Sequence, residues 1–192
     1  LASNLAECGG LFLDDSVQIH VTPTHYLTYP KPTDHAFMTI GVNATQPQST
    51  GMLRLQSPDP RVPLSIHPNY LEKASDREET IKGMRFIRRL VRETQLSQWA
   101  VSESLPGVKR DTDQDLEKAI SRYSQTLYHP ASTSRMGTMP ASVVTPEFRL
   151  RGFRQAWVVD SSVLPRLTHG NPNAMVMLLA HKAAQELAKF IG

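Results

Sequence analysis

The sequence predicts an α+β fold in which a mostly antiparallel sheet is backed by helices and followed by a C-terminal strand and a long helix. The first third of the chain contains short segments in which apolar and polar residues alternate. Loops rather than helical patterns separate these segments, which favours antiparallel pairing. Two helix starts follow, and the chain ends in a run of good helix formers.

The predicted strands are short. Residues 17–23 alternate with period two, a second strand is predicted over residues 35–43, and a third over residues 52–55. Residues 56–70 contain four prolines, so we expect them to be irregular and to wrap an edge.

Two helices are predicted in the middle of the chain, one that follows Ser75 and runs to about Glu93 and one over residues 113–124. Each begins with a capping pair: Ser75 with Glu78, and Thr112 with Asp115 in a weaker version. The first helix carries four arginines on its outer side, namely Arg85, Arg88, Arg89 and Arg92. Since the apolar residues of this helix, Ile81, Met84, Ile87, Leu90 and Val91, are expected to face inward, we expect the arginines to form a solvated face and no nucleic-acid site.

Composition excludes several classes of protein. The 192 residues are 40% apolar and 20% charged with a net charge of +3, as in an ordinary globular domain. The single cysteine, Cys8, permits neither an intrachain disulfide nor a cysteine metal cluster. His20 and His25 are separated by Pro23, so no metal site is expected there. No metal site is expected elsewhere either.

The sequence contains no apolar stretch of membrane-spanning length and no signal peptide. The compartment stays open, and the cytoplasm is slightly favoured. The chain begins with Leu1 rather than Met, as expected of a processed product, a fragment or one piece of a longer protein.

The last third of the chain assembles three different elements. Residues 128–137 form a polar loop that contains His129, which we call the histidine loop, and residues 157–162 form an apolar run predicted as a strand. Asn171 is then expected to cap a helix over residues 172–190, with Pro172 in its first position. Residues 174–180 are apolar all round, so the first two turns should be buried. A buried helix start needs an acceptor or anion in front of it, and a ligand is the obvious candidate.

The residue order in this third resembles a known family. The motifs are His-Pro-x-x-Thr-x-x-Met-Gly, Val-Val-Asp-x-Ser-Val-x-Pro, and Gly-Asn-x-Asn-Ala followed by a Lys-Ala-Ala helix. Together they are similar to the C-terminal signature of the glucose-methanol-choline (GMC) oxidoreductases, which are FAD-dependent alcohol oxidases and dehydrogenases. The resemblance covers essentially the whole chain, but only about the C-terminal third of a whole family member.

The resemblance implies roles for individual residues. His129 and Asn171 take the two positions over the flavin ring that handle the substrate hydroxyl. If the register were shifted by two residues, His169 would replace Asn171. Asp160 and Ser161 are implied to run along the FAD ribityl and pyrophosphate. The helix start, at Pro172 and Asn173, is implied to face the flavin, which makes both residues cofactor candidates.

The chemistry agrees with these roles. Alcohol oxidation moves a hydride from carbon to flavin while a base removes the hydroxyl proton, and an imidazole suits that base. An asparagine amide can hydrogen-bond the developing alkoxide. Each residue also has a plainer interpretation by itself: His129 as a loop histidine, Asn171 as a helix cap and Asp160 as a turn residue.

Departures from the family pattern are also visible. Ser132 stands where a glycine is usual, Ser134 stands where a small residue or cysteine is usual, and Thr145 stands where aspartate is common. The ten glycines never form Gly-x-Gly-x-x-Gly, the pattern that a flavin-binding Rossmann half requires. We therefore expect residues 1–156 to form a substrate-binding domain, and residues 157–192 to complete the FAD site of a Rossmann half located elsewhere.

Two hypotheses of different class follow. The first is the catalytic part of an FAD-dependent oxidoreductase acting on the CH–OH group of a small alcohol, inactive without its FAD-binding half. The second is a degenerate binding module without turnover. A serine hydrolase using Ser132 or Ser161 is disfavoured because no Gly-x-Ser-x-Gly elbow exists. Alone, the chain should expose the apolar face that the FAD half would cover.

Overall fold

The computed structural model describes residues 8–24 and 36–191, and the chain divides into two compact units. Unit 1 comprises Leu1–Ser49 and Tyr70–Gln125, and unit 2 comprises Thr50–Asn69 and Thr126–Gly192. The described residues form small antiparallel sheets and three α-helices, which confirms the α+β fold class. The division into a substrate-binding domain (residues 1–156) and a part that completes the FAD site (residues 157–192) stays a prediction.

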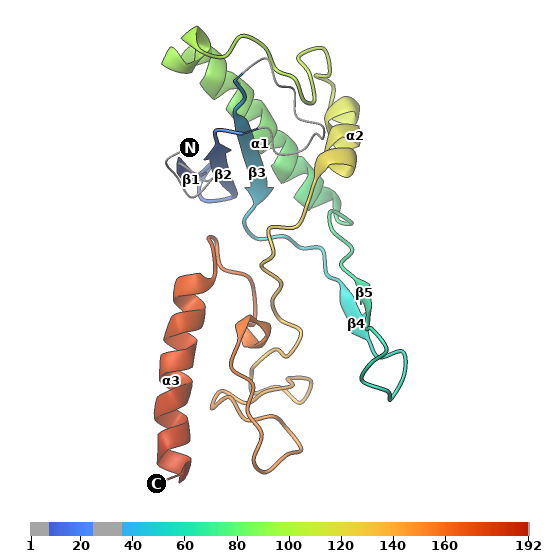
Figure 1. The fold of residues 1–192 in the computed structure, drawn as a ribbon, viewed down its shortest axis with the longest axis vertical. Coiled ribbons are helices and arrows are strands. Elements are labelled where there is room, and N and C mark those ends of the chain that lie inside the picture. The colour runs from blue at the N-terminus through green and yellow to red at the C-terminus, as the bar shows by residue number, and fades with distance from the viewer. Residues whose placement is uncertain (1–7, 25–35, 192) are drawn as a thin grey trace. The chain divides into compact units, whose positions relative to one another are not determined.

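Unit 1 contains a three-stranded antiparallel sheet in the order β1-β2-β3 (Figure 1). Its strands are β1 (Cys8–Phe12), β2 (Val17–Thr22) and β3 (Thr39–Ala44). The strand expected over residues 17–23 is confirmed, and its alternation is visible because Val17 and Ile19 are buried. The next strand begins later than expected, at Thr39. Residues 1–7 and His25 lie outside the described residues.

Two helices complete unit 1. Helix α1 (Ala74–Glu93) contacts β2 and β3, and α2 (Asp113–Tyr123) contacts α1. Gly83 allows α1 to approach the sheet closely, because a Cβ there would overlap the Val42 side chain. The buried side chains of α2 are Leu116, Ala119 and Ile120.

One of the two predicted capping pairs is confirmed. Thr112 Oγ1 accepts a hydrogen bond from the Asp115 amide at 3.1 Å and donates to the Asp115 carboxylate at 2.7 Å. The prediction for Ser75 and Glu78 is wrong. Helix α1 begins at Ala74, so Ser75 lies inside its first turn, and Lys73 in the cap position makes no side-chain cap bond.

Instead, a buried carboxylate fixes the start of α1. Asp76, only 3% exposed, accepts hydrogen bonds from the amides of Gln48 and Ser49, both at 2.8 Å, and from the Ser49 hydroxyl at 2.5 Å. Burial by itself would raise the pKa of Asp76, but these hydrogen bonds hold the pKa below its ordinary value. The carboxylate therefore binds the chain segment that follows β3 to the helix.

The expectation of a solvated arginine face on α1 is confirmed for Arg85, Arg89 and Arg92, which are exposed, and is wrong for Arg88. Arg88, whose side chain is 14% exposed, donates to both carboxylate oxygens of Glu103, at 2.7 and 2.9 Å. Arg85 pairs with Asp113 at 2.7 Å. Both guanidinium groups also pair with Asp111, so these arginines fasten the loop between α1 and α2 to the helix.

Unit 2 contains a two-stranded antiparallel ladder formed by β4 (Met52–Arg54) and β5 (Ser65–His67). The expected strand at residues 52–55 is confirmed, but the expectation that residues 56–70 are wholly irregular is wrong. The prolines of this segment lie outside the three residues of β5, so none of them removes a donor from the ladder.

Helix α3 (Asn173–Ile191) packs in unit 2 on a core that contains Val144, Phe148, Val163 and Ala183. The C-terminal end of this helix is held by a cation–π cluster. The guanidinium carbon of Arg149 lies 5.9 Å from the Trp157 ring centroid and 5.1 Å from that of Phe190, and the two rings meet edge to face at 5.0 Å.

Two expectations for this region are wrong. Residues 157–162 form no regular strand: Trp157 makes an isolated bridge with Arg149, and a short 3-10 helix η2 (Ser161–Val163) follows. The first two turns of α3 are mostly exposed rather than buried. The long helix itself is confirmed and begins one residue later than expected, where the Pro172 carbonyl accepts its first hydrogen bond, from the Val176 amide.

Among the described residues, none of the helices has the length and hydropathy that a membrane crossing requires.

We predict that Asp76→Asn destabilises unit 1 by about 1–3 kcal/mol, because an amide nitrogen would face donors that now meet a carboxylate oxygen. Since the folded-state pKa lies below the usual 3.8, this stabilisation is fully present above that pH and is lost as the pH falls through the folded-state pKa. Urea unfolding of both proteins at neutral and acidic pH measures the difference, which should shrink in acid. Glu78→Gln, at an exposed position of the same helix, is the control and should change little.

Candidate active site

The histidine loop is fastened to the chain segment around η2 by hydrogen bonds. The Ser134 amide donates to the Ser162 carbonyl at 3.0 Å, and the Met136 amide donates to the Val163 carbonyl at 2.9 Å. The Ser161 hydroxyl donates to the Pro130 carbonyl at 3.0 Å. The loop and the predicted cofactor segment therefore form one local structure within unit 2.

His129 lies half-buried in this loop. Its imidazole makes no hydrogen bond or ion pair within the part of the chain that the structure describes, so both ring nitrogens are available to a substrate. The backbone is left-handed at Tyr128, with φ of 61°, and at Ser132, with φ of 70°. Ser132 thus adopts a conformation that favours glycine, the residue usual there in the family.

Asp160 and Ser161 form the turn that enters η2. The Asp160 carboxylate accepts a hydrogen bond from the Ser162 amide at 2.8 Å, which caps the short helix. This cap ends the extended chain that begins at Trp157, and explains why the predicted strand is cut short. The Asp160 side chain is exposed, so its carboxylate keeps acceptor capacity for a ligand.

The start of α3 carries the remaining predicted residues. Pro172 is buried, whereas Asn171 and Asn173 are exposed. The Thr168 hydroxyl donates to the Gly170 carbonyl at 2.6 Å and closes the turn that leads into the helix. His169 is exposed on this turn. The structure therefore brings Asp160 and Ser161 to the histidine loop, and places Asn171, Pro172 and Asn173 together at a helix start.

Thr145 replaces the usual aspartate without loss of the turn. Its hydroxyl accepts hydrogen bonds from the amides of Glu147 and Arg149, both at 3.3 Å, and its carbonyl accepts one from Phe148 at 2.9 Å. A threonine hydroxyl can replace a carboxylate in this way because it accepts from the same local amides. The buried Phe148 that follows belongs to the core under α3.

Sequence reasoning missed two features of this region. The cation–π cluster joins Arg149, Trp157 and Phe190, which lie in three separate segments, so no local sequence pattern predicts it. The role of Ser161 as an anchor of the histidine loop was also missed, because its partner Pro130 is distant in the sequence. Among the described residues, no group of three or more His, Cys, Asp or Glu side chains could hold a metal ion.

Residues 47–180 match the family model described as GMC oxidoreductase. The alcohol dehydrogenase [acceptor] of Pseudomonas putida is 32% identical over 98% of this chain and 36% of its own length. The oxygen-dependent choline dehydrogenase of Pseudomonas fluorescens is 31% identical over 97% of this chain and 34% of its own length. The chain thus spans about a third of the curated relatives it matches.

Solved structures agree on the fold. Pyridoxine 4-oxidase from Mesorbium loti superposes with a TM-score of 0.83 at 28% identity, over 89% of this chain and 34% of that protein. Formate oxidase of Aspergillus oryzae, whose FAD modification has been studied by mutation, gives a TM-score of 0.82 at 23% identity, over 89% and 31%. The second likeness concerns the fold alone.

We predict that Ser161→Ala loosens the histidine loop, because the Pro130 carbonyl loses its donor. Amide hydrogen exchange at Ser134 and Met136 should accelerate by roughly twofold to tenfold, as expected from a hydrogen bond worth about 0.5–1.5 kcal/mol.

The matched control is Ser162→Ala, since only the backbone carbonyl of Ser162 takes part in the fastening. Equal exchange rates in the two variants would show that the Ser161 hydroxyl does not restrain the loop.

Proposed function

The chain belongs to the GMC oxidoreductase family, and on this premise we propose that it is the C-terminal catalytic part of an FAD-dependent enzyme that oxidises the CH–OH group of a small alcohol. One observation carries the proposal. The loop that presents His129 is fastened to Ser161–Val163 by three hydrogen bonds, so the proposed base lies in one local structure with two of the proposed cofactor residues, Asp160 and Ser161.

His129 is proposed as the base that takes the hydroxyl proton onto an imidazole nitrogen. The unpartnered imidazole supports this role, because a base must reach the proton directly or through one water. The left-handed residues on either side, Tyr128 and Ser132, fix the backbone that carries it. Backbone in such sparsely populated conformations is often kept where a side chain must be aimed.

Asn171 is proposed to hydrogen-bond the substrate oxygen while the proton leaves. Its amide can donate to a developing alkoxide without competing for the proton. The closed turn at Thr168–Gly170 and the buried Pro172 hold the backbone on both sides of Asn171. His169 lies exposed on the same turn and is the alternative partner if the register differs.

The residues present fit FAD. In the part of the chain described, the backbone amides of Asn173, Ala174 and Met175 have no acceptor, as expected at a helix start, and this donor set suits a flavin carbonyl edge. Asp160, Ser161, Pro172 and Asn173 are proposed to hold the cofactor. FAD, when bound, would accept the hydride from the substrate carbon.

The FAD-binding half is the proposed partner, in a longer chain or as a separate subunit. The first two turns of α3 support this, because they expose Met175, Met177 and Leu178, the last two at 66% and 58%. A helix start with such side chains resembles one face of an interface. The relatives named for alcohol, choline and pyridoxine make a small alcohol the proposed substrate class.

We predict that this chain, joined to the N-terminal two thirds of the Pseudomonas putida relative, binds FAD and that alcohols bleach its visible spectrum under anaerobic conditions. His129→Ala should retain the flavin spectrum but slow bleaching by about 10²–10⁴-fold, because the general base is lost.

Two variants complete this test. Asn171→Ala should slow bleaching more than His169→Ala does, and the reverse order would favour the shifted register. His181→Ala, at an exposed position later in α3, is the control and should react normally. Normal bleaching by the His129→Ala chimera would refute the assignment of His129 as the base. Flavin binding by the unaltered chimera without any bleaching by alcohols would favour the non-catalytic module.

We also predict that the chain alone self-associates through the start of α3. Sedimentation velocity should show a concentration-dependent increase in size, and Met177→Glu with Leu178→Glu should remove it, because charged side chains resist burial. Val101→Glu is the control, since Val101 is an exposed apolar residue that lies in unit 1 rather than on α3. Equal association of both variants would locate the contact elsewhere.

A further inference from the structure

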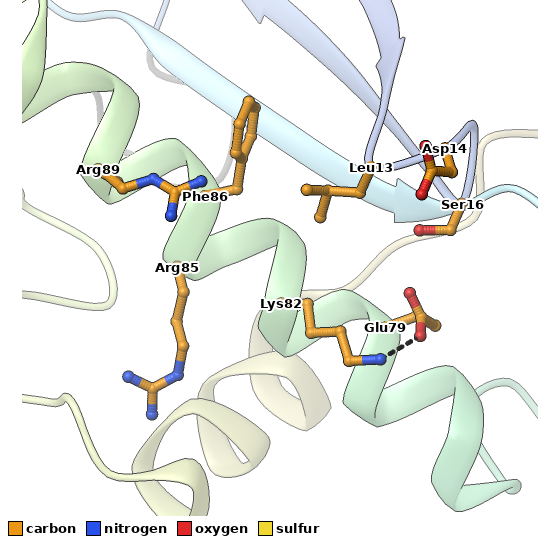
Figure 2. A pocket seen from close by; sticks show the side chains of 8 residues that line it. All are labelled: Leu13, Asp14, Ser16, Glu79, Lys82, Arg85, Phe86 and Arg89. Atoms are coloured by element: carbon orange, nitrogen blue, oxygen red, sulfur yellow. Dashed lines mark hydrogen bonds and ion pairs between the residues drawn. The ribbon is translucent and has the colours of Figure 1, made fainter.

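Unit 1 contains an open hollow between the β1–β2 turn and one face of α1 (Figure 2), with a volume of about 580 Å³. Leu13, Asp14 and Ser16 line it from the turn, and five residues between Glu79 and Arg89 line it from the helix. None of these residues belongs to the candidate active site.

The wall formed by the turn is unusually constrained. Leu13, Asp14 and Asp15 are three successive left-handed residues, with φ of 54°, 54° and 61°. Side chains rarely tolerate this backbone, and it persists where the surroundings fix it. Here the buried Thr45 does so: its hydroxyl donates to the Asp15 carbonyl at 2.6 Å, and its amide donates to the Ser16 carbonyl at 3.0 Å.

The helix wall contains one ion pair of its own. The pKa of Glu79 lies below its ordinary value mainly because Lys82 hydrogen-bonds its carboxylate. The Lys82 ammonium lies 2.5 Å from that carboxylate, as the dashed line in Figure 2 marks. These two charges of the helix wall therefore compensate each other before any ligand arrives.

Most charges around the hollow are already paired. Lys82 pairs with Glu79, and Arg85 pairs with acidic residues of the following loop and α2. Two charges remain. Within the described residues, the Arg89 guanidinium has no carboxylate partner and lies over the Phe86 ring at 5.7 Å, and the Asp14 carboxylate has no cationic partner.

These two unpaired charges lie at opposite ends of the hollow, with the side chains of Phe86 and Leu13 between them (Figure 2). The helix residues from Glu79 to Arg89 extend over about 15 Å, at the α-helical rise per residue. The hollow therefore presents a cation, an apolar middle and an anion in line.

We infer that this hollow binds an elongated zwitterion: a molecule with a carboxylate that pairs with Arg89, an apolar chain that packs on Phe86 and Leu13, and an ammonium group that pairs with Asp14. An arginine held over an aromatic ring presents its planar N–H groups to a carboxylate with little loss of side-chain freedom. The constrained turn likewise presents Asp14 without an ordering step.

The test is an NMR titration of the full 192-residue chain with 8-aminooctanoate, octanoate and octylamine. We expect 8-aminooctanoate to shift the amide signals of residues 13–16 and 79–89. Its Kd should be about threefold to fivefold lower than that of either single-ended probe, the size expected of one exposed ion pair.

Two variants assign the ends. Arg89→Gln should remove the advantage of 8-aminooctanoate over octylamine, and Asp14→Asn should remove its advantage over octanoate. Arg92→Gln, an exposed arginine near the end of the same helix, should change neither.

Several results would overturn the inference: no saturable shift with 8-aminooctanoate, shifts confined to other residues, or equal Kd values for the three probes. The comparison of probes uses the unaltered chain, so it decides the question even if a variant fails to fold. Equal Kd values would reduce the hollow to a nonspecific apolar surface.

Discussion

The architecture of unit 2 depends on the hydrogen bonds that fasten the histidine loop to the turn around η2. Backbone bonds from Ser134 and Met136 align the loop with Ser162 and Val163, and Val163 then enters the core on which α3 packs. A polar loop without a regular ladder would otherwise leave its amides to water. One irregular connection thus joins the proposed base, the proposed cofactor residues and the long helix.

Unit 1 uses charged side chains for the same purpose. The Asp76 carboxylate holds the segment after β3, and the Arg88 guanidinium holds the loop between α1 and α2. Both partners are irregular segments whose backbone has few other bonds, so charge-assisted hydrogen bonds supply the order that sheets and helices supply elsewhere. Helix α1 therefore serves as the common support of unit 1, and its polar residues are as structural as its apolar ones.

The sequence predicted those features whose causes are local. The cap at Thr112 needs only Asp115, and the period of β2 is visible in six residues. The family motifs likewise lie within short segments, which is why His129 and Asn171 could be chosen. The missed features join distant residues: Asp76 with Ser49, Ser161 with Pro130, and Arg149 with Phe190. The exposed start of α3 was missed for another reason. Apolar composition predicts that a helix face is buried, but it does not say whether the residues that bury it belong to this chain.

The division of each unit into two segments has a consequence for synthesis. Unit 1 closes only when residues 70–125 rejoin the sheet, and unit 2 closes only when residues 126–192 rejoin the β4–β5 ladder. As the chain leaves the ribosome, unit 1 can finish folding once residue 125 has emerged, whereas residues 50–69 must wait for partners made much later. During that interval the apolar side chains of Met52, Leu53 and Ile66 in β4 and β5 are exposed, as they still are in the folded chain, and exposed apolar side chains of this kind are what chaperones bind.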